Sequence, residues 1–178
     1  MKSEVSLLNK YYTWKKIELN GVTYHLKGNV FFNNKFLSPE ELVELISPLI
    51  CKEDHDQRKK TENFLKKLNG EFAIVAETEN IIFCAVDKLR STPLFYTVTE
   101  DTFIVSDSAC YLKDKTNQRL NEENAAEFML VGYVTGNDTL FDGIKQIRNG
   151  EILIYQKETD NLKTSYYFRF LHSNYYGL

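Results

Sequence analysis

Residues 68–96 constrain the fold of this chain more than any other stretch of its sequence. They contain two apolar runs, residues 72–76 and 81–86, which are joined by Thr78-Glu79-Asn80. Neither run alternates between apolar and polar residues, as a strand with one solvent-exposed face does. Continuous apolar strands are typical of sheets that are covered on both faces. The two runs therefore predict central strands inside a layered core.

Two helices before these strands are predicted to cover one face of the sheet. Ser38 is a helix N-cap with Pro39 at the first helical position, and Pro48 distorts or ends this helix. A second helix over residues 56–68 is expected to stop at Asn69-Gly70. The buried positions expected on the two helices are Leu42, Leu45, Ile46, Leu49, Phe64, Leu65 and Leu68. Helices beside doubly covered strands favour an α+β fold, a four-layer α/β/β/α sandwich of two antiparallel sheets.

Three further elements have clear local signals. Asn20-Gly21 predicts a hairpin turn, and the alternation after it predicts a strand with one solvent-exposed face, on which His25 is a surface residue. Asn121 caps a helix that Gly132 ends. The apolar residues of this helix that are expected to pack inward are Ala125, Phe128, Met129 and Val131. Residues 151–157 and 163–170 predict a closing hairpin.

The stretch at residues 68–96 also resembles the class II glutamine amidotransferase domain of the asparagine synthetase and β-lactam synthetase family. The residues that carry this resemblance are Leu68, Gly70, Phe72, Ala73, Asp87, Leu89, Pro93, Leu94 and Tyr96. Residues 103–114 and 132–155 are similar to two later motifs of these domains, in the same order and spacing. The resemblance implies the N-terminal-nucleophile hydrolase fold. Arg90 stands where the family usually has glycine, so the turn between Asp87 and Pro93 is open to a different shape.

The catalytic nucleophile of that family is not found where the resemblance would place it. An N-terminal-nucleophile amidotransferase uses a cysteine at residue one after Met removal, whose own amine assists as the base. Here Lys2 stands in that position, and Ser3 would become terminal only after removal of two residues. A cysteine inside the chain lacks the adjacent free amine. We therefore assign no catalytic residue.

The substrate pocket of the family is also altered in this sequence. Active relatives carry N-G-E on a strand, which supplies an oxyanion-hole donor and substrate contacts. The corresponding residues here are Lys27, Gly28 and Asn29, of which only the glycine is kept. These three are the candidate substrate-binding residues of a degenerate pocket, and the alternative is a plain strand with a polar outward residue. The expectation is that glutamine hydrolysis has been lost.

The rest of the sequence limits the cofactors and partners. The glycines stand singly, so no phosphate-binding loop and no cofactor are expected. Cys51, Cys84 and Cys110 are widely spaced without a CxxC pair, which predicts reduced thiols and no metal site. The net charge of −3 is scattered, so no nucleic-acid partner is expected. Without a signal-peptide pattern or an apolar run near 18 residues, the protein is predicted to be cytoplasmic and to have no membrane contact.

The domain limits follow from the resemblance. Residues 1–170 are predicted to form one degenerate amidotransferase-like domain, and 171–178 a tail or the start of a linker to a synthetase domain. The chain is then either a fragment or a free-standing remnant. Its expected partner is a synthetase domain or protein of the asparagine synthetase type, and a homodimer is left open.

Three functional hypotheses remain at this point. The first is a catalytically silent amidotransferase-like domain with a structural or docking role in an ATP-dependent, amide-forming system. The second is a stand-alone module of the same fold that binds a ligand or a protein. The third is a glutaminase with an unusual nucleophile such as Ser3. We expect no enzymatic activity from the chain alone.

Overall fold

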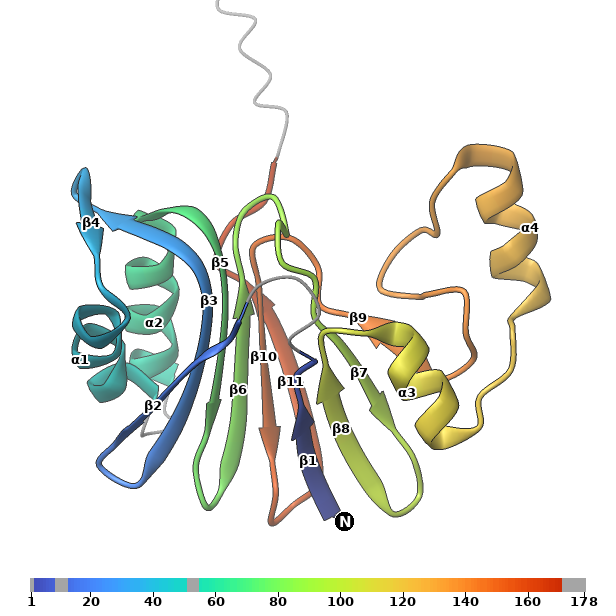
Figure 1. Cartoon of the computed structure of the whole chain (residues 1–178), viewed down its shortest axis with the longest axis horizontal. Coiled ribbons are helices and arrows are strands. Elements are labelled where there is room, and N and C mark those ends of the chain that lie inside the picture. Colours follow the sequence, from blue (N-terminus) through green and yellow to red (C-terminus); the bar gives the residue numbers. More distant parts are fainter. Residues whose placement is uncertain (1, 9–12, 51–54, 171–178) are drawn as a thin grey trace, which may run out of the picture.

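The structure of the chain, a computed structural model, describes residues 2–8, 13–50 and 55–170. Four layers succeed one another across the molecule (Figure 1): helices α1 and α2, a seven-stranded sheet, a four-stranded sheet, and helix α3. This is the predicted α/β/β/α sandwich of the α+β class. The predicted tail at 171–178 lies outside the described residues.

The seven-stranded sheet is antiparallel throughout. Its order is β11-β10-β6-β5-β3-β2, with β4 added on β3. The strands are β2 (Lys15–Leu19), β3 (Val22–Phe32), β4 (Lys35–Leu37), β5 (Leu68–Glu77), β6 (Ile81–Val86), β10 (Glu151–Gln156) and β11 (Asn161–Tyr166). The two apolar runs are β5 and β6 in its centre, and β10 and β11 form the predicted closing hairpin. The sequence therefore predicted the middle of this sheet and its closing hairpin correctly.

The four-stranded sheet has the order β1-β8-β7-β9. Its strands are β1 (Lys2–Ser6), β7 (Phe95–Val98), β8 (Thr102–Ser106) and β9 (Ile144–Gln146). β1 pairs with β8 in parallel, so the prediction of two purely antiparallel sheets is wrong for this edge. A parallel partner is available here because β1 and β8 are separated by most of the chain, which leaves room for a crossover.

Helices α1 and α4 begin where their capping residues predicted. The helices are α1 (Pro39–Ile50), α2 (His55–Lys67), α3 (Ala109–Thr116) and α4 (Glu122–Val131). Ser38 and Glu41 cap α1 reciprocally: the Glu41 N–H donates to Ser38 Oγ at 3.1 Å, and the Ser38 N–H donates to Glu41 Oε2 at 2.8 Å. Asn121 caps α4 and Gly132 ends it in a left-handed conformation, as predicted.

Two apolar cores hold the layers together. The first lies between the α1–α2 pair and the seven-stranded sheet, where Tyr24, Ile46 and Leu65 are fully buried. The second lies between the sheets, where the rings of Phe103 and Tyr155 stack with centroids 4.0 Å apart. A smaller cluster seats α3 on the outer face of the four-stranded sheet. Each central strand thus has both faces covered, which explains its continuous apolar sequence.

Several local expectations were wrong. Asn69 and Gly70 do not end α2 but lie inside β5, which follows the helix without a loop. On α1, Leu45 is exposed, and Val43 and Ile50 are buried with Leu42 and Ile46. The helix does not break at Pro48 but continues to Ile50. None of the α4 residues is buried, so the predicted inward packing of this helix is wrong.

The polar face of β3 is less exposed than predicted. Tyr24 and Leu26 face the helices, as the alternation indicated. His25 lies on the opposite face of the strand, beside the second sheet, and is half-buried. Burial and the nearby Lys16 ammonium lower the pKa of His25. None of the helices in the described parts of the chain is both long and apolar enough to cross a membrane.

Candidate functional site

The predicted pocket residues line a groove at one end of the seven-stranded sheet. Lys27, Gly28 and Asn29 lie in the second half of β3, near the point where β4 pairs with this strand. The groove has a volume of about 670 Å³ and is also lined by Glu71 and Thr92. The structure therefore brings all three predicted residues into one cavity.

Two glycines let the backbones of β3 and β5 approach closely beside this groove. Gly28 and Gly70 lie on either side of the paired residues Asn29 and Glu71, with φ of +99° and +105°. A Cβ on Gly28 would lie 2.1 Å from the Glu71 carbonyl oxygen, and one on Gly70 would lie 2.1 Å from that of Asn29. Only glycine permits this close approach of the two backbones. The absence of a side chain at both positions therefore permits the close approach of β3 and β5 beside the groove.

The side chain of Asn29 is held by the neighbouring strand. Its Nδ2 donates to Glu71 Oε1 at 3.1 Å, and both residues are exposed to solvent. Asn29 stands where active relatives have an acidic residue. Glu71, on β5, brings a carboxylate to the groove beside Asn29. The family motif did not predict this carboxylate.

Lys27 does not point into an open oxyanion hole but takes part in a contact between the two sheets. Its Nζ lies 3.7 Å from Asp107 Oδ2 and 5.3 Å from the centre of the Trp14 ring. Trp14 Nε1 donates to Asp107 Oδ2 at 2.9 Å, and the Leu8 N–H donates to Asp107 Oδ1 at 2.7 Å. The side chains of Lys27 and Asp107 are only 13% and 8% exposed. We call Trp14, Lys27 and Asp107 the inter-sheet clamp.

Replacing the acidic member of this clamp should destabilise the sandwich measurably. Asp107→Asn keeps the shape of the side chain but leaves one of the two N–H donors facing an amide N–H₂ and removes the charge opposite Lys27. We expect a loss of about 2 kcal/mol in the free energy of unfolding, measured by urea denaturation. Asp101→Asn, on an exposed turn, should change the same quantity by less than about 0.5 kcal/mol. Equal losses in the free energy of unfolding for the two variants would show that the inter-sheet clamp does not stabilise the protein.

Asp87 fixes the turn on the other side of the groove. Its carboxylate is 1% exposed and accepts from the N–H groups of Phe72 at 3.1 Å, Leu89 at 2.7 Å and Ser91 at 2.9 Å. The Ser91 hydroxyl donates to it at 3.3 Å. Because Phe72 pairs with Gly28, the Asp87 side chain ties the turn to β5 and, through it, to β3.

The turn keeps a glycine-like backbone at Arg90. Its φ is +58°, in the left-handed region that glycine adopts without strain. The guanidinium lies 5.4 Å from the Phe95 ring centre, and burial lowers the pKa of Arg90. Arg90 therefore has a backbone conformation that glycine adopts more readily than any residue with a side chain.

The start of β1 lies at the end of the sandwich that is remote from the groove. β1 runs parallel to β8, so that Ser6 pairs with Ser106 beside the clamp and Lys2 pairs with Thr102 at the opposite end. The four residue steps between Lys2 and Ser6 span about 13 Å. Figure 1 shows the N-terminus at the lower edge of the sheets and β4 at the upper left. Neither Lys2 nor Ser3 lines the groove.

No thiol of the described residues lines the groove. Cys84 lies on β6 in the core between the sheets, where burial raises the pKa of its thiol far above the usual value. Cys110 is exposed on α3, and Cys51 lies outside the described residues. Among the described residues, no group of three His, Cys, Asp or Glu side chains could hold a metal ion. The groove offers an ammonium, hydroxyls and a carboxylate, which can bind a polar ligand.

Sequence reasoning missed Trp14, Glu71 and Asp107. Asp107 directly precedes Ser108, whose side chain caps α3. Lys27 and Asp107 are 80 residues apart, and no local pattern records that two sheets will bring them together. The solitary tryptophan was the one available hint, since a buried indole N–H usually needs an acceptor.

Comparison with known proteins gives a family match and two partial structural likenesses. Residues 55–167 match the glutamine amidotransferase domain family. No curated protein matches the sequence. The solved structure of glutamine phosphoribosylpyrophosphate (PRPP) amidotransferase from B. subtilis, complexed with ADP and GMP, is 18% identical over 88% of this chain and 31% of that chain, with a TM-score of 0.47. A structure described as the allosteric regulatory enzyme of purine biosynthesis has the same identity and coverage and a TM-score of 0.49. The chain spans about a third of the length of each.

Proposed function

Because the chain belongs to the glutamine amidotransferase domain family, we propose that it is a catalytically silent member that docks on a partner. The partner is a synthetase of the asparagine synthetase type, which forms an amide bond at the expense of ATP. In this role the domain does not release ammonia from glutamine. It stabilises or orients the protein that carries out the amide-forming step.

The observation that carries this proposal is the arrangement at the groove. A glutamine-hydrolysing site needs a nucleophile and a neutral oxyanion donor that face the same carboxamide. None of the described residues that line the groove is a cysteine, and Lys27 is engaged with Asp107 and Trp14. Even if processing exposed Ser3 as the first residue, its hydroxyl would lie at the other end of β1. A Ser3 nucleophile and the groove would thus be separated by the length of β1.

The purified protein, incubated with glutamine, should release no ammonia above the buffer background. The loss of a nucleophile lowers the rate of an enzyme by about 10⁴-fold or more. An active class II amidotransferase domain, assayed at the same concentration, is the control. Ammonia release that disappears in a Ser3→Ala variant would overturn the proposal in favour of an unusual glutaminase.

The docking role is tested with the synthetase itself. The synthetase, purified as a separate protein, should bind this chain in isothermal titration calorimetry. It should form its amide product from ATP and free ammonia or an amine whether or not glutamine is present. Product formation that requires both this chain and glutamine would contradict a silent role.

The groove also supports a second candidate, a module that binds a small polar ligand. The observation that favours it is the cavity of about 670 Å³, whose lining includes Lys15 and Lys27 as well as Glu71 and Thr92. Such a lining matches a ligand that carries both a negative and a positive group. Titration with free amino acids, followed by calorimetry, distinguishes this module from a pure docking domain.

A further inference from the structure

Helix α4 exposes apolar side chains that the fold does not use. Met129 and Leu130, in the last turn of the helix, are 84% and 85% exposed. Figure 1 shows α4 beyond α3, on the side of the molecule opposite α1 and α2. The exposed apolar residues in the last turn of this helix and just after it, which we call the α4 patch, are Phe128, Met129, Leu130, Val131 and Tyr133. Contiguous exposed apolar patches usually mark a surface that another molecule covers.

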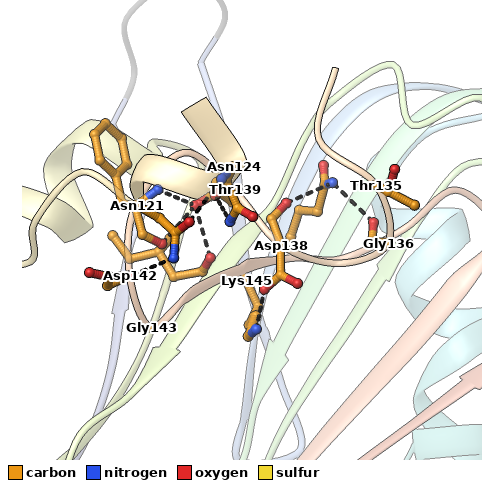
Figure 2. Close-up of polar contacts among 12 residues, drawn as sticks. Asn121, Asn124, Thr135, Gly136, Asp138, Thr139, Asp142, Gly143 and Lys145 are labelled. Carbon is orange, nitrogen blue, oxygen red and sulfur yellow. Dashed lines mark hydrogen bonds and ion pairs between the residues drawn. The ribbon is translucent and has the colours of Figure 1, made fainter. Parts of the chain in front are cut away.

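Polar contacts, rather than apolar packing, hold α4 in place (Figure 2). The Asn121 side chain caps the helix and donates from Nδ2 to Asp142 Oδ1 at 2.7 Å. Asn124 Nδ2 donates to the Thr139 carbonyl at 2.7 Å. Thr139 is itself buried and donates to the Ile144 carbonyl at 2.9 Å, which joins the segment to β9. The helix is therefore oriented while its apolar side chains stay exposed.

The far end of the helix is held in the same way. Glu127 accepts from the hydroxyl and the N–H of Thr135 on the returning segment. Gln146 Nε2 donates to the Gly136 carbonyl at 3.2 Å and to the Asp138 carbonyl at 3.0 Å. A rigid surface loses little conformational entropy when a partner binds it. These contacts therefore prepare the α4 patch for binding.

The charge of the segment indicates what kind of partner fits. Residues 120–144 contain no Lys, Arg or His, but they carry the carboxylates of Glu122, Glu123, Glu127, Asp138 and Asp142. Glu122 and Glu123 are exposed at the first turn of α4. A second copy of the chain would bring an equally acidic segment to the interface, and like charges in apposition oppose association. The complementary surface is apolar with a border of Lys and Arg.

We propose that the α4 patch is the surface on which the synthetase partner docks, with an apolar groove bordered by Lys and Arg receiving the helix. This rests on the function proposed above and names the element that carries it out. Recognition of one helix by an apolar groove depends on a few large side chains. Met129 and Leu130, as the most exposed of the patch, are expected to provide most of the affinity.

The test compares a double variant inside the α4 patch with a single variant outside it. Each of them removes exposed apolar surface. In calorimetry against the separately purified synthetase, Met129→Ser/Leu130→Ser should weaken binding about 30-fold or more. Leu89→Ser, at a 75% exposed position outside the patch, should stay within about twofold of the unsubstituted protein. Because these side chains are exposed, all three proteins should have the same melting temperature.

The electrostatic part of the proposal has its own measurement. Glu122→Gln/Glu123→Gln should lower the association rate several-fold at low salt, and the difference should shrink as ionic strength rises. A Glu40→Gln variant, exposed at the start of α1, is the matched control and should associate at the unsubstituted rate.

The outcomes separate this inference from the proposed function. Full binding by Met129→Ser/Leu130→Ser would overturn the role of α4 and leave a docking domain that uses another face. Failure of the unsubstituted protein to bind the synthetase would overturn both. Concentration-dependent dimerisation in light scattering that the double variant abolishes would assign the patch to a second copy of this chain instead.

Discussion

Gly28→Ala should lower the free energy of unfolding by at least about 4 kcal/mol. The added Cβ would lie 2.1 Å from the oxygen and 2.8 Å from the carbon of the Glu71 carbonyl. These are backbone atoms of a paired central strand, so they can move only if β3 and β5 separate. The φ of +99° adds strain for any residue with a side chain. The loss is measured by urea denaturation, in which the free energy of unfolding is fitted as a function of urea concentration.

Gly21→Ala separates the two causes. Gly21 also has a positive φ, +76°, but nothing lies within 4 Å of the position of its Cβ. This variant should lose only about 1 kcal/mol, which reflects backbone strain alone. The difference between the two variants then measures the collision with β5. Equal losses would show that the strands at the groove are not as close as described.

Asp87→Ala should lower the free energy of unfolding by about 4 kcal/mol. The substitution leaves the N–H groups of Phe72, Leu89 and Ser91 without their acceptor. Hydrogen bonds to a charged acceptor contribute more than those between neutral groups, and buried donors without a partner are costly. The turn beside the groove should open at the same time, which hydrogen exchange at the Leu89 and Ser91 amides would detect as faster exchange.

Two control variants test whether the loss of stability in Asp87→Ala comes from the hydrogen bonds to its carboxylate. Asp114→Ala removes a carboxylate that is 73% exposed and paired only with Lys113 on the surface, and it should change stability by less than about 0.5 kcal/mol. Ser91→Ala removes only the hydroxyl bond of 3.3 Å to Asp87 and should cost about 1 kcal/mol or less. An Asp87→Ala protein as stable as either of these would show that the turn does not depend on the carboxylate.

The groove and the α4 patch lie in different parts of the molecule. The groove opens near β4, whereas α4 lies beyond the four-stranded sheet (Figure 1). Substitutions that close or remodel the groove therefore need not disturb α4. This separation is consistent with a domain that loses glutamine hydrolysis while it keeps a docking surface.

Local signals predicted the elements whose ends depend on neighbouring residues. Ser38 and Glu41 lie three residues apart and satisfy each other's backbone, so their pattern was sufficient to place the start of α1. Asn20-Gly21 was sufficient for the hairpin because both residues adopt positive φ. Gly70 was misread because a helix stop and a close approach of two strand backbones both favour a glycine with positive φ, and the sequence does not distinguish them.

The candidate site was predicted only as far as its motif residues. Gly28 and Asp87 were singled out only by their resemblance to family motifs, and the structure shows what each does to the backbone beside the groove. Lys27 was recognised as a departure, but its partners Trp14 and Asp107 were not, since they come from other strands and turns. The buried face of α4 was predicted wrongly because apolar residues on a helix show what could be covered, without showing whether anything covers it.

Helix caps and tight turns were thus decided by short-range chemistry, because backbone groups within a few residues of one another satisfy each other. The two central strands were recognised from the sequence because their residues are apolar without alternation. The direction of β1, the clamp between the sheets and the exposure of α4 were decided by assembly. These features depend on which surfaces meet when segments up to about a hundred residues apart pack together, and only the folded chain contains that information.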